Sequence, residues 1–89
     1  MHTLIPLCAL VPGQQATVRR LDMPEPLRRR LLDLGLIPHT TVACVGRSPG
    51  GDPTAYEICH AVVAIRRVDA AGVWVQPLVP GEGDTYGAD

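Results

Sequence analysis

The side chains best suited to chemistry in this 89-residue chain are three cysteines and three histidines. Cys59 and His60 are adjacent, and His39 lies in a second predicted turn. Thiolate and imidazole groups bind zinc and other transition-metal ions. A structural zinc site needs four ligands at spacings such as Cys-x2-Cys, which the chain lacks. These three residues therefore predict a weak or subunit-bridging metal site, and the alternative is that both histidines are solvated turn residues.

No sequence pattern in the chain predicts catalysis. It has no GxSxG, no HExxH, no glycine-rich phosphate loop and no lysine. Cys59 and His60 do not suit a nucleophile and base if they lie in a strand, because adjacent strand residues point to opposite faces. The sequence therefore predicts a protein that is not an enzyme.

The strongest local concentration of charge is the run Arg28, Arg29 and Arg30. Guanidinium groups make bidentate contacts to carboxylates, so this run predicts a docking surface for an acidic protein, with a solvated helix face as the alternative. Nucleic acid is not predicted as a partner, because the net charge is −1 and no aromatic residue is interleaved with the arginines.

A helix over residues 24–35 must position these arginines. Prolines suit its first turn, and Gly35 suits the left-handed residue that follows a helix. Leu27, Leu31 and Leu34 recur at helical spacing and predict the buried stripe, so the arginines point outward. Arg29 and Asp33 are four residues apart and predict a weak ion pair.

The rest of the chain predicts five or six short strands. Alternation in the strand at 16–21 places Ala16, Val18 and Arg20 on one face. In the strand at 54–60, Tyr56 and Ile58 are predicted to point toward the core. A sheet this small hides its edges by curling on itself, which predicts a small β-barrel with the helix at one end. The predicted strands are residues 3–7, 16–21, 41–47, 54–60, 61–68 and 73–78. Pro6 restricts the first of these strands to an edge of the sheet.

The length of 89 residues and mass of 9.5 kDa predict one domain, over residues 1–79, followed by a flexible tail over 80–89. The chain is 46% hydrophobic but has no apolar run of about 20 residues. We therefore expect a globular protein with no direct membrane insertion. An odd number of cysteines and no signal-peptide pattern at the start predict a reduced, cytoplasmic protein.

In the order and spacing of three segments, the chain resembles the FeoA family of small SH3-like domains. These segments are RLLDLGLIP at 30–38, SPGGDP at 48–53, and VAIRR at 63–67 followed by VWV at 73–75. Three positions depart from the family pattern. His39 and His60 stand where the family usually has glycine or a glycine nearby, and Val62 stands where a charged residue is more usual.

The resemblance implies a non-enzymatic accessory protein of ferrous iron uptake, which docks on the cytosolic part of the membrane permease FeoB and is recruited by it to the inner face of the membrane. It implies no required cofactor, and a weakly bound zinc or iron ion and a homodimer stay open. The alternatives are a metal-binding, self-associating regulator and an SH3-like regulatory module related to those of metal-dependent repressors. The predicted partner-binding residues are Arg28, Arg29, Arg30, Leu36, Gly50, Gly51 and Asp52.

Overall fold

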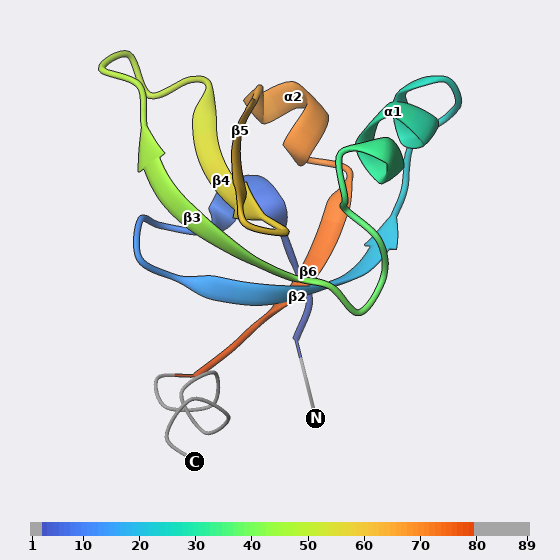
Figure 1. Ribbon diagram of the computed structural model, residues 1–89, viewed down its shortest axis with the longest axis horizontal. Coiled ribbons are helices and arrows are strands. Elements are labelled where there is room, and N and C mark those ends of the chain that lie inside the picture. The colour runs from blue at the N-terminus through green and yellow to red at the C-terminus, as the bar shows by residue number, and fades with distance from the viewer. Residues whose placement is uncertain (1–2, 80–89) are drawn as a thin grey trace.

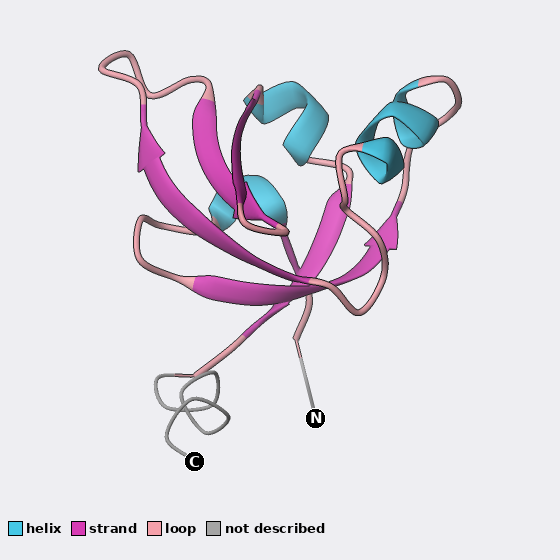
Figure 2. Ribbon diagram, viewed as in Figure 1, coloured by secondary structure: helices cyan, strands magenta, loops and turns pink. Residues whose placement is uncertain are grey.

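Six antiparallel strands form one curled sheet in the computed structural model, which describes residues 3–79 (Figure 1). The order across the sheet is β1-β6-β2-β3-β4-β5. The strands are β1 (Ile5–Pro6), β2 (Gln15–Leu21), β3 (Thr41–Arg47), β4 (Thr54–Ile58), β5 (Ala61–Ile65) and β6 (Val73–Pro77). Within the same residues the helices are the 3-10 helix η1 (Leu7–Ala9), α1 (Leu27–Asp33) and α2 (Arg67–Ala70) (Figure 2). The prediction of a mainly β fold is confirmed.

The sheet curls on itself but does not close into a barrel. Across residues 3–79, β1 and β5 are the two ends of the strand order, and no ladder joins them. The word barrel therefore describes the shape only loosely. Pro6 lies in β1, at the edge of the sheet, where proline removes no ladder hydrogen bond.

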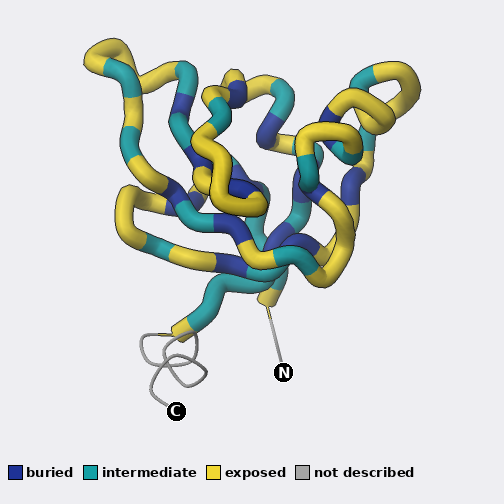
Figure 3. Tube along the Cα trace, in the orientation of Figure 1, coloured by how far each residue is buried: buried dark blue, intermediate teal, exposed yellow. Residues whose placement is uncertain are grey.

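The core lies inside the curl (Figure 3). Tyr56 is the largest of the fully buried side chains, and its hydroxyl donates a hydrogen bond of 3.4 Å to the carbonyl of Leu7. Burial raises the pKa of this phenol to about 12. The other side chains at or below 2% exposure include Leu7, Leu10, Ala16, Val18, Leu31, Leu36, Val42, Cys44, Ile58, Ala70, Val73 and Val75.

A β-bulge corrects the predicted facing of β2. Val18 pairs with Val75, but the next pair along the ladder is Arg20 with Trp74, so Arg19 is an extra residue in β2. The extra residue reverses the alternation after it. Leu21 is therefore buried with Ala16 and Val18, and Arg20 is exposed with its guanidinium carbon 5.7 Å from the ring centre of Trp74.

Helix α1 buries a narrower stripe than predicted. Leu31 is buried and Leu27 is half-buried, but Leu34 is 38% exposed. The helix ends in a Schellman motif: the Gly35 amide donates to the Leu32 carbonyl at 2.9 Å, and the Leu36 amide donates to the Leu31 carbonyl at 3.1 Å. This turn takes Leu36 rather than Leu34 into the core.

The two strands that follow β3 are shorter than predicted. β4 ends at Ile58, so Cys59 and His60 form a two-residue turn instead of extending the strand. β5 ends at Ile65, and the chain then forms α2, which the sequence analysis did not predict. The predicted tail over 80–89 lies outside the described residues. Within 3–79, no helix has the length and apolar character needed to cross a membrane.

Replacing Gly35 by alanine is expected to lower the free energy of unfolding by about 1–3 kcal/mol. The φ angle of Gly35 is +110°, and an added Cβ would lie 2.9 Å from Cγ2 of Ile58. Gly46→Ala is the matched control, because a Cβ there meets nothing within 4 Å and no left-handed φ is required. Urea unfolding of both variants tests this, and an equal loss of stability would contradict the proposed role of Gly35.

Candidate functional site

The arginines of α1 are exposed, as predicted. Arg28 lies 3.6 Å from a carboxylate oxygen of Glu25, and Arg30 lies 3.8 Å from one of Asp69 in α2. Both arginine side chains are about half exposed or more, so these contacts hold them weakly and leave them available to a partner. The predicted Arg29–Asp33 pair does not form, and Arg29 has no ion pair among residues 3–79.

Helix α2 joins the two segments that the sequence analysis assigned to partner binding. It contacts α1 through the Arg30–Asp69 pair. The loop at residues 48–53 contacts it through Asp52, whose carboxylate accepts a hydrogen bond of 2.9 Å from the backbone amide of Arg67. In Figure 1 the loop, α2 and α1 occupy the upper end of the molecule.

Arg66 and Arg67, which the sequence analysis left out of the site, are exposed at the start of α2. We call the five residues of α1 and of this segment the arginine cluster: Arg28, Arg29, Arg30, Arg66 and Arg67. They are five of the eight arginines in the chain. Their grouping comes from the Arg30–Asp69 contact between α1 and α2, because the two arginine runs are far apart in sequence. These five exposed arginines lie on a protein whose net charge is only −1.

The loop at residues 48–53 is exposed at its tip but ordered by its own hydrogen bonds. The Gly51 amide donates to the Ser48 carbonyl at 2.7 Å, and the Ser48 hydroxyl donates to the Pro53 carbonyl at 2.9 Å. Gly51 has a φ of +90°, which glycine adopts without steric cost. Gly50 and Gly51 are therefore presented to solvent on a defined backbone, whereas the carboxylate of Asp52 is already engaged by α2.

Leu36 is not a surface residue. Its side chain is 0% exposed, so its prediction as a partner-binding residue is corrected: it belongs to the core. The exposed apolar side chains around it are Leu34 at 38% and Ile37 at 52%.

The predicted metal-ligating residues lie in two turns with unusual backbone conformations. Cys59 and His60 form the turn between β4 and β5 with φ of +51° and +69°, and His39, before β3, has φ of +80°. A two-residue hairpin turn with positive φ at both positions is the type I′ geometry, which favours glycine or asparagine. The positions where the sequence departs from the glycine of its family pattern are thus left-handed in the structure.

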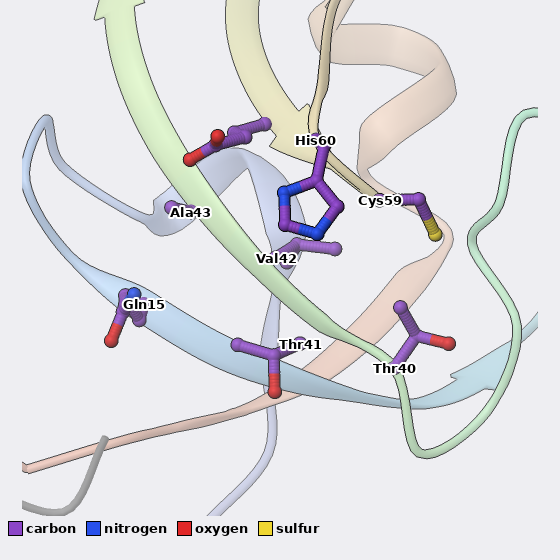
Figure 4. A pocket seen from close by; sticks show the side chains of 8 residues that line it. Gln15, Thr40, Thr41, Val42, Ala43, Cys59 and His60 are labelled. Atoms are coloured by element: carbon purple, nitrogen blue, oxygen red, sulfur yellow. The ribbon is translucent and has the colours of Figure 1, made fainter. Parts of the chain in front are cut away.

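Cys59 and His60 line a shallow pocket of about 240 Å³ on the outer face of β3 (Figure 4). In Figure 4 the imidazole of His60 lies near Val42, whereas Sγ of Cys59 points in another direction. Glu57 lines the same pocket. Among residues 3–79, however, no three histidine, cysteine, aspartate or glutamate side chains are grouped so that they could hold a metal ion. The metal site therefore stays a prediction.

Replacing His60 or His39 by glycine is expected to raise the free energy of unfolding by about 0.5–1 kcal/mol, because relief of the left-handed strain exceeds the entropic cost of glycine. His60→Ala and His39→Ala are the controls, since alanine removes the imidazole but keeps the Cβ. Thermal unfolding in the presence of a chelator measures the difference. Stabilisation by alanine equal to that by glycine would show that the imidazole, not the backbone, causes the strain.

Comparison with known proteins agrees with this fold. The model of the FeoA domain family matches residues 5–77. A fusion protein of Porphyromonas gingivalis, described as Fe(2+) transport protein A joined to Fe(2+) transporter FeoB, is 34% identical over 70 residues. The match covers 79% of this chain, which spans only 8% of the length of that relative.

Solved structures of FeoA proteins have the same fold. The FeoA protein of Chlorobium tepidum is 32% identical with a TM-score of 0.79, over 89% of this chain and 75% of that one. The zinc-complexed FeoA of Stenotrophomonas maltophilia, described as a prokaryotic SH3 domain protein, is 28% identical with a TM-score of 0.71, over 80% and 88%. A manganese-dependent transcriptional repressor shares the fold alone, at 22% identity and a TM-score of 0.78 over 88% and 43%. With its family-model match and its SH3-like sheet, the chain belongs to the FeoA family.

Proposed function

We propose that this chain is a non-enzymatic accessory protein of ferrous iron uptake, which acts in the cytoplasm by docking on the cytosolic part of FeoB and regulating it. The observation that carries the proposal is the relative in which the two proteins are joined in one polypeptide. Fusion holds two modules at high effective concentration, which favours pairs that work in contact. We propose the same contact for this chain.

The arginine cluster is the surface that suits such docking. Its guanidinium groups are exposed, and its internal ion pairs are long and solvent-screened. Little stabilisation is therefore lost when these arginines leave their internal ion pairs to form bidentate contacts with carboxylates on a partner. The glycine tip of the 48–53 loop lies on the same upper side of the molecule, across α2 from α1, and offers exposed backbone groups there (Figure 1).

Reversing the charge of Arg29 is expected to weaken binding to the cytosolic domain of FeoB by about tenfold or more, because a buried or partly buried charge pair contributes strongly to an interface. Arg29→Glu changes no ion pair within residues 3–79. The double variant Arg28→Glu/Arg29→Glu is expected to abolish binding. Isothermal titration calorimetry of the full chain with the FeoB domain measures both effects.

Arg19→Glu is the matched control for Arg29→Glu. Arg19 is likewise exposed and without an ion pair among the described residues, but it lies on β2 outside the arginine cluster. Its reversal should leave the affinity unchanged, and all variants should keep the melting temperature within a few degrees of the parent. Equal weakening by Arg19→Glu and Arg29→Glu would show that binding depends on net charge and not on this surface.

A second candidate function is metal-dependent self-association, favoured by the zinc in the Stenotrophomonas maltophilia structure. Because Cys59 and His60 of one copy point in different directions, a shared ion would take one of the two residues from each copy, and thiolate and imidazole ligands suit zinc. Sedimentation velocity with added Zn²⁺ is expected to show a dimer that EDTA dissociates and that Cys59→Ser prevents. A dimer that persists in EDTA, or a monomer at all zinc concentrations, would exclude this function.

A further inference from the structure

The two edges of the sheet are protected very differently. β1 is two residues long and contains Pro6, which are common ways of blocking an edge. β5 is five residues long, has the sequence AVVAI, contains no proline or charge, and pairs with β4 without a bulge. Natural proteins rarely leave an apolar edge strand unprotected, because its free backbone groups pair with other chains. β5 is therefore a candidate for binding an additional strand.

The pairing register identifies which groups of β5 are free. The two-residue turn makes Ile58 and Ala61 a hydrogen-bonded pair, and such pairs alternate along an antiparallel ladder. Val62 and Ala64 therefore lie at non-hydrogen-bonded positions, and their N–H and C=O groups point away from β4. Each residue offers one donor and one acceptor to a new strand. Val62 is 62% exposed and Ala64 is also exposed, so both residues lie at the surface.

A charged cleft of about 430 Å³ lies along the same edge, between β5 and α1. Ala64, Ile65 and Arg66 all line it, although consecutive side chains of an extended segment point to opposite faces. A cleft on one face of the sheet would contact every second residue, so a cleft that contacts all three residues lies along the edge of the strand. Arg30 lines its other side and pairs with Asp69, while Arg66 has no ion pair among residues 3–79. The cleft therefore holds more positive charge than its single carboxylate can balance.

We propose that β5 and this cleft form a strand-addition site for an extended acidic segment of the protein partner. The segment would pair with the free backbone groups of Val62 and Ala64 and place a carboxylate against Arg66 and Arg30. Main-chain hydrogen bonds then supply affinity, and the arginines supply selectivity for acidic side chains. This inference rests on the proposed function, since it describes how the partner would dock beside the arginine cluster.

A second copy of the chain fits this site less well than an acidic partner. β5 is preceded by Cys59 and His60 and followed by Arg66 and Arg67, so the strand and its flanks carry no carboxylate. Pairing of two β5 strands in either direction would leave Arg66 without an opposite charge. The charge of the cleft therefore selects an acidic segment as its occupant.

Proline substitution tests the strand addition directly. Ala64→Pro removes an N–H that points away from β4, so the ladder between β4 and β5 is kept. We expect it to weaken binding of the FeoB cytosolic domain by about tenfold or more, through one lost hydrogen bond and the steric block of the edge. Ala64→Thr, which keeps the N–H, is the matched control and should bind as the parent does. If Ala64→Pro does not fold, as judged by amide dispersion in NMR, Val62→Pro replaces it.

A peptide measurement separates failure of this inference from failure of the proposed function. The probe is an acetylated seven-residue peptide in which valine alternates with glutamate, and the control peptide has lysine in place of glutamate. The acidic peptide is expected to slow hydrogen exchange of the Val62 and Ala64 amides in the parent protein and to slow it less in the Arg66→Glu variant. The lysine peptide is expected to have no effect on the exchange of these amides.

The possible outcomes are distinct. FeoB binding that Ala64→Pro leaves unchanged would overturn strand addition and leave the proposed function standing. Protection of Val62 and Ala64 by the acidic peptide without any FeoB binding would support the site and reject FeoB as the partner. Equal protection by both peptides, or concentration-dependent dimerisation that Ala64→Pro abolishes, would overturn the acidic partner. Absence of protection by the acidic peptide would overturn the site itself.

Discussion

Two bulges interrupt the curled sheet, one at Arg19 in β2 and one between Cys44 and Gly46 in β3. Strand β2 pairs with β3 on one side and β6 on the other, so a bend in it changes the direction of the whole sheet. A bulge increases local twist and reverses the side-chain alternation beyond it. Leu21 therefore joins the buried residues where regular alternation would have placed Arg20. A charged side chain at that core position would have lost its hydration without a partner.

Helix α2 lies between α1 and the 48–53 loop (Figure 1). Asp69 reaches Arg30 on one side, and Asp52 reaches the Arg67 amide on the other. Both contacts are polar and solvent-accessible, so each contributes little stability by itself. Their effect is to hold α1, α2 and the 48–53 loop together. A partner that binds this end would therefore meet charged side chains and exposed loop backbone in one arrangement.

Several turn residues have a left-handed backbone conformation, among them Gly35, His39, Cys59 and His60. Gly35 adopts its φ of +110° without a Cβ, and the side chain of Cys59 packs close to the space that a Cβ would occupy there. Cys59, His60 and His39 adopt positive φ with side chains present, which costs conformational energy. The side chains of these three residues, two imidazoles and a thiol, are exposed at the surface in turns. Such strain persists where the surrounding structure determines it, and the hairpin register of β4 and β5 does so for Cys59 and His60.

The sequence by itself determined the β-rich class, the α1 helix, the turn chemistry and the outward arginines, because each depends on periodicity or on residues close along the chain. The tertiary structure alone decided that Leu36 is buried, that α2 forms, and that Arg66 and Arg30 line one cleft. It also decided that the sheet stays open at β5. These features depend on contacts between residues distant in sequence. Local patterns carry no information on how far a sheet curls or which edge it leaves unpaired.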